Sequence, residues 1–122
     1  MQSQKRGKWT FTKIAPRFVS YDRAETLKFY GDLDFDITMD EEGFLIVSRD
    51  GVDIHLNIFE GPADKKKCSV CWIGVNGIEA LYEQGKSKNL VSYPLEIKPY
   101  GLKEFAANDP SRNLILFAEP VS

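Results

Sequence analysis

Apolar and polar positions follow one another along this chain in two successive sets of segments that share one order. Alternation and short apolar runs are typical of strands, whereas apolar positions three and four apart are typical of a helix. Each set predicts a strand, a helix and three further strands. The elements span 9–20, 22–30, 35–39, 44–48 and 52–59 in the first set, and 70–75, 77–85, 95–97, 103–107 and 113–118 in the second. Two halves with one element order predict an α+β fold made from a duplicated βαβββ unit.

Residues with turn and capping chemistry mark several of these boundaries. Asp22 is a candidate helix N-cap, and Glu25 three residues later completes a capping-box pattern. Asp50-Gly51 is a hairpin signal. The segment 109–113, Asp-Pro-Ser-Arg-Asn, predicts a tight turn because its proline fixes φ and its Asp and Asn side chains hydrogen-bond nearby backbone. Pro16 lies inside the first predicted strand, which favours an edge or irregular strand there.

The length of 122 residues fits a single domain with its own core. We expect a flexible arm over 1–8, a first unit over 9–60 and a second over 68–120. A stretch with Gly-Pro and three consecutive lysines, 60–67, reads as a solvated linker between the units.

Charge and hydropathy exclude several classes of partner. The net charge is −2 and the isoelectric point is about 5.4, so we expect binding to neither nucleic acid nor an anionic membrane. No apolar run approaches the length that spans a bilayer. The first eight residues are polar and basic and lack the apolar core of a secretory signal, so we expect a cytoplasmic protein.

The stretch from Pro99 to Pro120 carries the most specific motif, an aromatic-Gly pair, Glu-Phe, Asp-Pro, and an Asn before an apolar run. In this order it resembles the closing hairpin of the vicinal oxygen chelate superfamily, and most closely the bleomycin resistance protein branch. The resemblance covers about 15–120 and implies a cup-shaped mixed sheet with the helices on its outer face. Further motifs in the family order are Leu27-Lys28-Phe29-Tyr30, Arg49 to Leu56 and Ala80-Leu81-Tyr82.

The resemblance also shows where a metal would be held in metal-dependent members of the superfamily. Those positions fall on Ala15, His55, Val70 and Leu116. Alanine, valine and leucine offer no lone pair, and a divalent ion at a catalytic site typically needs about three protein ligands. We therefore expect no metal and no other cofactor. A metal-dependent enzyme of the glyoxalase or dioxygenase type remains the alternative.

His55 is the single histidine of the chain, and strand alternation places Asp53 and Asn57 on the same face. The opposite face is apolar and fits packing under the helices, so the polar face should line the cup. There His55 could bind ligand or act as a general base, or it could only be hydrogen-bonded to a neighbour. No matched nucleophile or oxyanion donor accompanies it. We expect His55 and Asp53 to contribute to binding.

The same alternation on the fifth strand assigns Val70, Trp72 and Gly74 to the cup, and Cys71, Ile73 and Val75 to the helix side. An indole with room beside it at Gly74 suits the stacking of a planar ligand. Phe44 and Tyr100 fall where bleomycin resistance proteins carry aromatic residues that line the drug crevice. The alternative is that these aromatic residues belong to the core.

These observations favour a metal-free protein that sequesters a small molecule, bleomycin-like in being aromatic or glycopeptide-type, without bond chemistry. The resemblance implies a homodimer with each crevice completed by the partner chain. The expected ligand-binding residues are Phe44, Asp53, His55, Trp72 and Tyr100. A second alternative is that the cup is only a dimer interface and takes no ligand.

Overall fold

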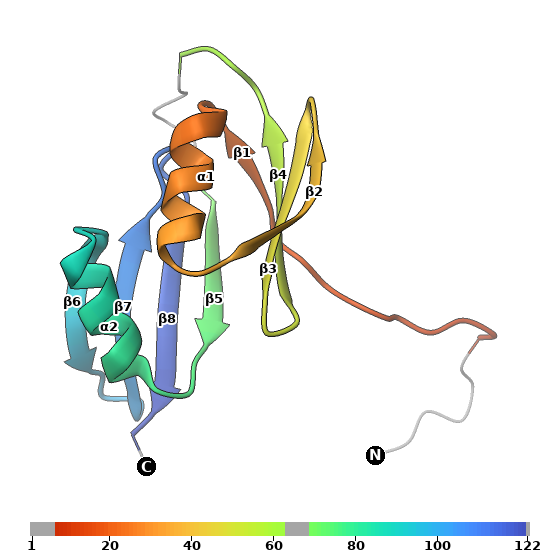
Figure 1. The fold of residues 1–122 in the computed structure, drawn as a ribbon. Coiled ribbons are helices and arrows are strands. Elements are labelled where there is room, and N and C mark those ends of the chain that lie inside the picture. Colours follow the sequence, from red (N-terminus) through yellow and green to blue (C-terminus); the bar gives the residue numbers. More distant parts are fainter. Residues whose placement is uncertain (1–6, 63–68, 122) are drawn as a thin grey trace.

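The computed structural model describes residues 7–62 and 69–121. Most of the arm expected over 1–8 and the lysine run of the linker therefore lie outside the described residues. Figure 1 shows two successive βαβββ units, so the predicted fold class is confirmed. The elements are β1 (Arg17–Ser20), α1 (Arg23–Asp32), β2 (Asp36–Glu41), β3 (Phe44–Arg49), β4 (Val52–Ile58), β5 (Val70–Gly74), α2 (Ile78–Ser87), β6 (Val91–Ile97), β7 (Leu102–Asn108) and β8 (Leu114–Pro120).

Each unit forms its own four-stranded mixed sheet with the same topology. Sheet 1 has the order β1-β4-β3-β2, and sheet 2 has the order β5-β8-β7-β6. In each sheet the first strand pairs in parallel with the last, and the other pairs are antiparallel. The first strand of each unit is thus an edge strand.

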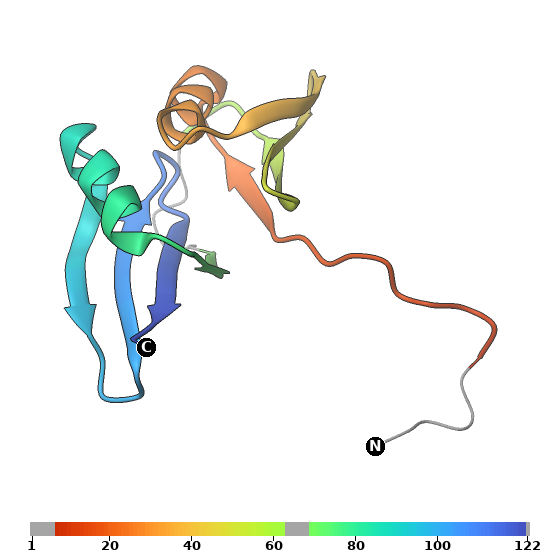
Figure 2. The ribbon, with the colours of Figure 1, turned by 60° about the horizontal axis from the view of Figure 1, so that its bottom comes forward.

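Three boundaries differ from the sequence prediction for identifiable reasons. β1 begins only at Arg17: the carbonyl of Pro16 still accepts the backbone N–H of His55 in β4 at 3.0 Å, but the backbone before it runs away from the sheet (Figures 1 and 2). α1 continues through Gly31, and the backbone N–H of Leu33 then closes its last turn. β6 begins at Val91 and includes Pro94, which an edge strand with register shifts on both sides of Tyr93 tolerates.

One hydrophobic core serves both units. Helix α1 lies between the two sheets in both views, and its Phe29 and Tyr30 are buried with residues of each sheet (Figures 1 and 2). The predicted N-cap is confirmed, since the Asp22 side chain accepts from the backbone N–H of Glu25 at 3.0 Å. No helix within the described residues is long and apolar enough to cross a membrane.

The face of each sheet that is turned away from this core is called here its open face. On β4, Ile54 and Leu56 are fully buried, so Asp53 and His55 occupy the open face of sheet 1. On β5, Cys71, Ile73 and Val75 pack against the core, as predicted, which assigns the residues between them to the open face of sheet 2.

Candidate ligand-binding site

The open face of sheet 2 carries a row of side chains that the strand register brings side by side. Trp72 pairs with Leu116, Leu116 with Ala106, and Ala106 with Tyr93. Trp72 is 55% exposed and Tyr93 is 61% exposed, while the small Ala106 between them leaves a trough. Trp72 therefore lies outside the core.

Gly74 determines how the indole of Trp72 lies. A Cβ atom added at Gly74 would be 3.3 Å from Cζ3 of Trp72, so the indole leans over the glycine. The space expected beside Gly74 is thus occupied by the indole itself, which presents a flat apolar surface to solvent.

Tyr100 lies in the turn between β6 and β7 and is 64% exposed. The next residue, Gly101, has a φ of 89°, a conformation that favours glycine. The Tyr100 hydroxyl donates to Oε1 of Glu104 at 2.8 Å. This hydrogen bond raises the pKa of Tyr100 above its ordinary value, so the hydroxyl stays a donor and fixes the side chain on the open-face carboxylate.

The open face of sheet 1 brings Phe44 and His55 together. Their rings meet edge to face with centroids 5.4 Å apart, and the guanidinium carbon of Arg17 lies 5.2 Å from the Phe44 centroid. Phe44 is half-buried and belongs to this face, not to the core. The sequence interpretation missed Arg17. The feature that would have identified Arg17 is the register of the parallel pair β1–β4, in which Arg17 is the partner of His55.

Asp53 is two residues before His55 on the same face. Its carboxylate forms an ion pair with Lys13, which belongs to the extended segment before β1. Hydrogen bonds from Lys13 and from Ser48 lower the pKa of Asp53. Asp53 is therefore already engaged by the chain's own cation and serves as an anchor for residues 7–16.

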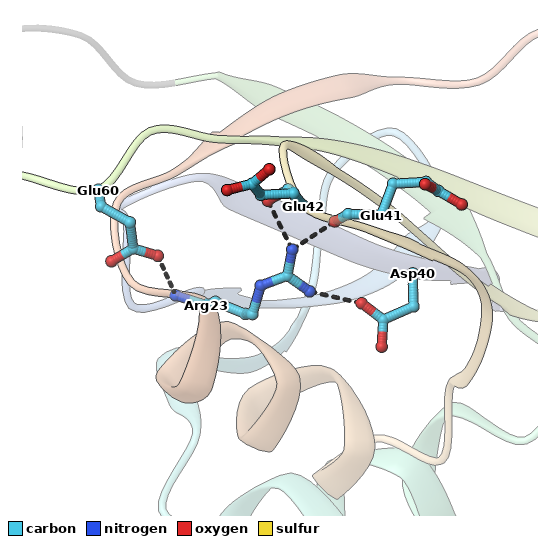
Figure 3. Close-up of polar contacts among 5 residues, drawn as sticks. All are labelled: Arg23, Asp40, Glu41, Glu42 and Glu60. Atoms are coloured by element: carbon cyan, nitrogen blue, oxygen red, sulfur yellow. Dashed lines mark hydrogen bonds and ion pairs between the residues drawn. The ribbon is translucent and has the colours of Figure 1, made fainter.

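The acidic turn between β2 and β3 is tied to the start of α1. Figure 3 shows the guanidinium of Arg23 reaching Oδ1 of Asp40 at 2.5 Å and the backbone carbonyls of Glu41 and Glu42. The backbone N–H of Arg23 donates to Glu60 at 3.3 Å. Asp40 thus has a structural partner, whereas the carboxylates of Glu41 and Glu42 make none of the contacts drawn.

The residues at the superfamily's metal positions do not fit a metal ion. Only His55 among the four carries a donor atom, and its ring contacts Phe44. Ala15, Val70 and Leu116 offer hydrocarbon. Within 7–62 and 69–121, no three His, Cys, Asp or Glu side chains lie close enough together to hold an ion.

The five residues expected to bind ligand fall into two groups, three on sheet 1 and two on sheet 2. The larger hollow, of about 530 Å³, lies elsewhere, between the β3–β4 hairpin and the start of α2, and none of the five lines it. A smaller hollow of about 240 Å³ lies on sheet 2 and includes Leu116, the register partner of Trp72. It is also lined by Tyr93 and Glu104, two residues that the sequence interpretation did not assign to the binding site.

A family model described as "Glyoxalase superfamily protein" matches residues 1–122. The chain belongs to the glyoxalase superfamily. No curated protein matches it by sequence.

Solved structures place this glyoxalase superfamily chain beside bleomycin resistance proteins in fold. A bleomycin resistance determinant encoded on transposon Tn5 has a TM-score of 0.81 and 20% identity, covering 90% of this chain and 98% of that chain. A bleomycin-binding protein complexed with bleomycin has a TM-score of 0.77 and 22% identity, covering 89% and 98%. A glyoxalase/bleomycin resistance protein/dioxygenase from Alicyclobacillus acidocaldarius has a TM-score of 0.73 and 16% identity, covering 89% and 91%. At these identities the likeness establishes the fold and leaves the ligand open.

Proposed function

We propose that this protein binds and sequesters a planar aromatic or glycopeptide-type small molecule without chemical change. The observation that carries the proposal is the indole of Trp72, which leans over Gly74 and belongs to a residue that is 55% exposed. An exposed flat aromatic surface beside an apolar trough favours stacking of a planar group. A solved structure of similar fold is a bleomycin-binding protein complexed with bleomycin, which supports a ligand of this size and chemistry.

The crevice would be completed in a homodimer. The open faces of both sheets expose apolar side chains, among them Val19 of sheet 1 and Val70 of sheet 2. The segment before β1 exposes more, with Phe11 at 88% and Ile14 at 95%. Exposed apolar side chains and an uncovered edge strand of this kind favour association. A second copy of the chain is the partner that would cover both the apolar side chains and the edge strand.

Trp72 fluorescence tests the ligand proposal directly. The chain has two tryptophans, so a Trp9→Phe variant leaves Trp72 as the sole indole reporter. We expect bleomycin, or another planar aromatic compound in a thermal-shift panel, to quench Trp72 and to raise the melting temperature. The matched control is Trp72→Phe, in which Trp9 should show no saturable quenching. A panel in which no compound changes either signal would refute the proposal.

A further inference from the structure

The smaller hollow on sheet 2 is lined by apolar, aromatic and charged side chains, Glu104 among them. Leu116 and Ala106 supply hydrocarbon, and Tyr93 supplies an aromatic wall. Glu104 lies in the same hollow and is only 9% exposed. A carboxylate this buried is costly unless its oxygens are paired.

Among the residues that the structure describes, one oxygen of Glu104 has a hydrogen-bond partner and the other has none. Oε1 accepts the hydroxyl of Tyr100 at 2.8 Å, and no donor among the described residues reaches Oε2. A hydroxyl satisfies one lone pair but supplies no positive charge. Oε2 is therefore accessible from the hollow that Glu104 lines, since no fully buried side-chain oxygen among the described residues lacks a hydrogen-bond partner.

The ammonium that lines this hollow is hydrogen-bonded to another carboxylate. Lys98 also lines the hollow, but its ammonium is bonded to Oε1 of Glu96 at 2.9 Å. This bond raises the pKa of Lys98, which therefore stays charged and paired. Two carboxylates and one ammonium leave the hollow with a net charge of −1, which one further positive group would neutralise.

We infer that Glu104 is the anionic group of a subsite for an organic ammonium on the ligand. The inference rests on the proposed function, because the ligand's planar part would stack on Trp72. Register pairs Gly74 with Ala118 and Ala118 with Glu104, so two strand spacings separate the stacking position from the carboxylate. That is roughly 10 Å between backbones. A planar ring joined to an amine by about three carbons spans this gap once the side chains' reach is included, and the tyrosine faces add cation–π attraction.

The test compares two indoles that differ only in charge. The cationic probe is 3-(3-aminopropyl)indole, and its neutral isostere is 3-butylindole. Each is titrated into ¹⁵N-labelled protein and followed by the amide shifts of β6 and β7. We expect the amine to bind about tenfold more tightly, which corresponds to about 1.4 kcal/mol. Failure of the amine to bind, or equal affinities, would overturn the subsite.

Two variants test which residue causes the preference for the cationic probe. Glu104→Gln keeps an acceptor for Tyr100 and removes the charge, so the two probes should bind equally. Lys98→Met changes a partly exposed side chain and removes the ammonium that pairs with Glu96, which makes the hollow more negative, so the preference for the amine should increase. A preference that survives Glu104→Gln would show that Glu104 only positions Tyr100. Amine binding without butylindole binding would uphold the subsite and count against stacking on Trp72.

Discussion

The hydroxyl of Tyr30 in α1 donates a 2.8 Å hydrogen bond to Oδ2 of Asp109 in the turn between β7 and β8. Both residues are buried, and they come from different units. Asp109 accepts three more hydrogen bonds, from the backbone of Ser111 and Asn113 and from the Asn113 side chain. Asn113 in turn donates to the carbonyl of Val19 at 2.9 Å. The turn therefore joins the second unit to the first strand and helix of the first unit.

Tyr30→Phe should destabilise the fold by about 1.5–3 kcal/mol, the usual range for a hydrogen bond to a charged group. The substitution removes one oxygen from a fully buried site and leaves the ring packing in place. Urea unfolding followed by circular dichroism measures the change. Tyr82→Phe is the control, because that ring is only half-buried and should be near neutral. An unchanged midpoint for Tyr30→Phe would show that this bond contributes nothing net.

The loss of unfolding free energy caused by Tyr30→Phe should depend on pH. Burial raises the pKa of Asp109, and its hydrogen bonds oppose part of that rise. A raised pKa means that Asp109's contribution to stability is greatest below its ordinary pKa and is lost as pH rises through the folded-state value. Removing the hydrogen bond from Tyr30 raises the folded-state pKa of Asp109 further, because that bond lowers it in the parent. The free energy of unfolding should therefore differ more between the parent and Tyr30→Phe near pH 7 than near pH 4. Equal differences at both pH values would contradict this.

Trp72→Ala should weaken a bound aromatic ligand by about tenfold or more. Stacking on an aromatic side chain contributes roughly 1–3 kcal/mol by alanine substitution. His55→Ala should reduce ligand affinity less, because a hydrogen bond from an accessible imidazole contributes about 0.5–1.5 kcal/mol net. Titration calorimetry on both variants measures this order. The reverse order would move a polar or catalytic role for His55 ahead of stacking.

Gly74→Ala should weaken the same ligand while the protein stays folded. The added methyl would be 3.3–3.4 Å from two indole carbons of Trp72, which forces the ring to tilt. We expect a loss of affinity smaller than that of Trp72→Ala, with a shifted tryptophan emission maximum in the Trp9→Phe background. Unchanged emission and affinity would show that the indole does not need this glycine.

We expect a dimer at micromolar concentration in sedimentation equilibrium. Phe11→Ser combined with Ile14→Ser should weaken it by at least tenfold, because burying each such side chain contributes roughly 1.5–3 kcal/mol. Lys28→Ser, at an exposed position on α1, is the matched control. A parent protein that sediments as a monomer at these concentrations would remove the basis for a shared crevice.

Purified protein should contain no stoichiometric metal, and zinc, nickel, manganese and iron should not raise its melting temperature. One imidazole with hydrocarbon at the three matching positions cannot hold a divalent ion against water. Elemental analysis and thermal shift measure this. An ion bound by His55 and two other side chains would make the metal-dependent alternative the better one.

Local pattern was sufficient for much of the fold. Alternation of residue type places Trp72 and Cys71 on opposite faces of one strand whatever surrounds it, because a strand's side chains repeat every two residues. The cap at Asp22 and the turn bonds from Ser111 and Asn113 to Asp109 also arise within a few residues of chain. These features depend on short-range geometry that the sequence carries directly.

Only the tertiary structure decided which distant groups meet. Arg17 reaches Phe44 through the parallel pairing of β1 with β4, and the Asp109 turn, which looked purely local, binds Tyr30 from 79 positions away. Glu104 belongs to the Glu-Phe motif of the sequence, but only the strand register places it beside the small Ala118 and in a hollow. Such contacts depend on strand register and on how helix α1 packs between two sheets. Register and helix packing are both set by the burial of side chains from the whole chain, so no single segment of sequence determines them.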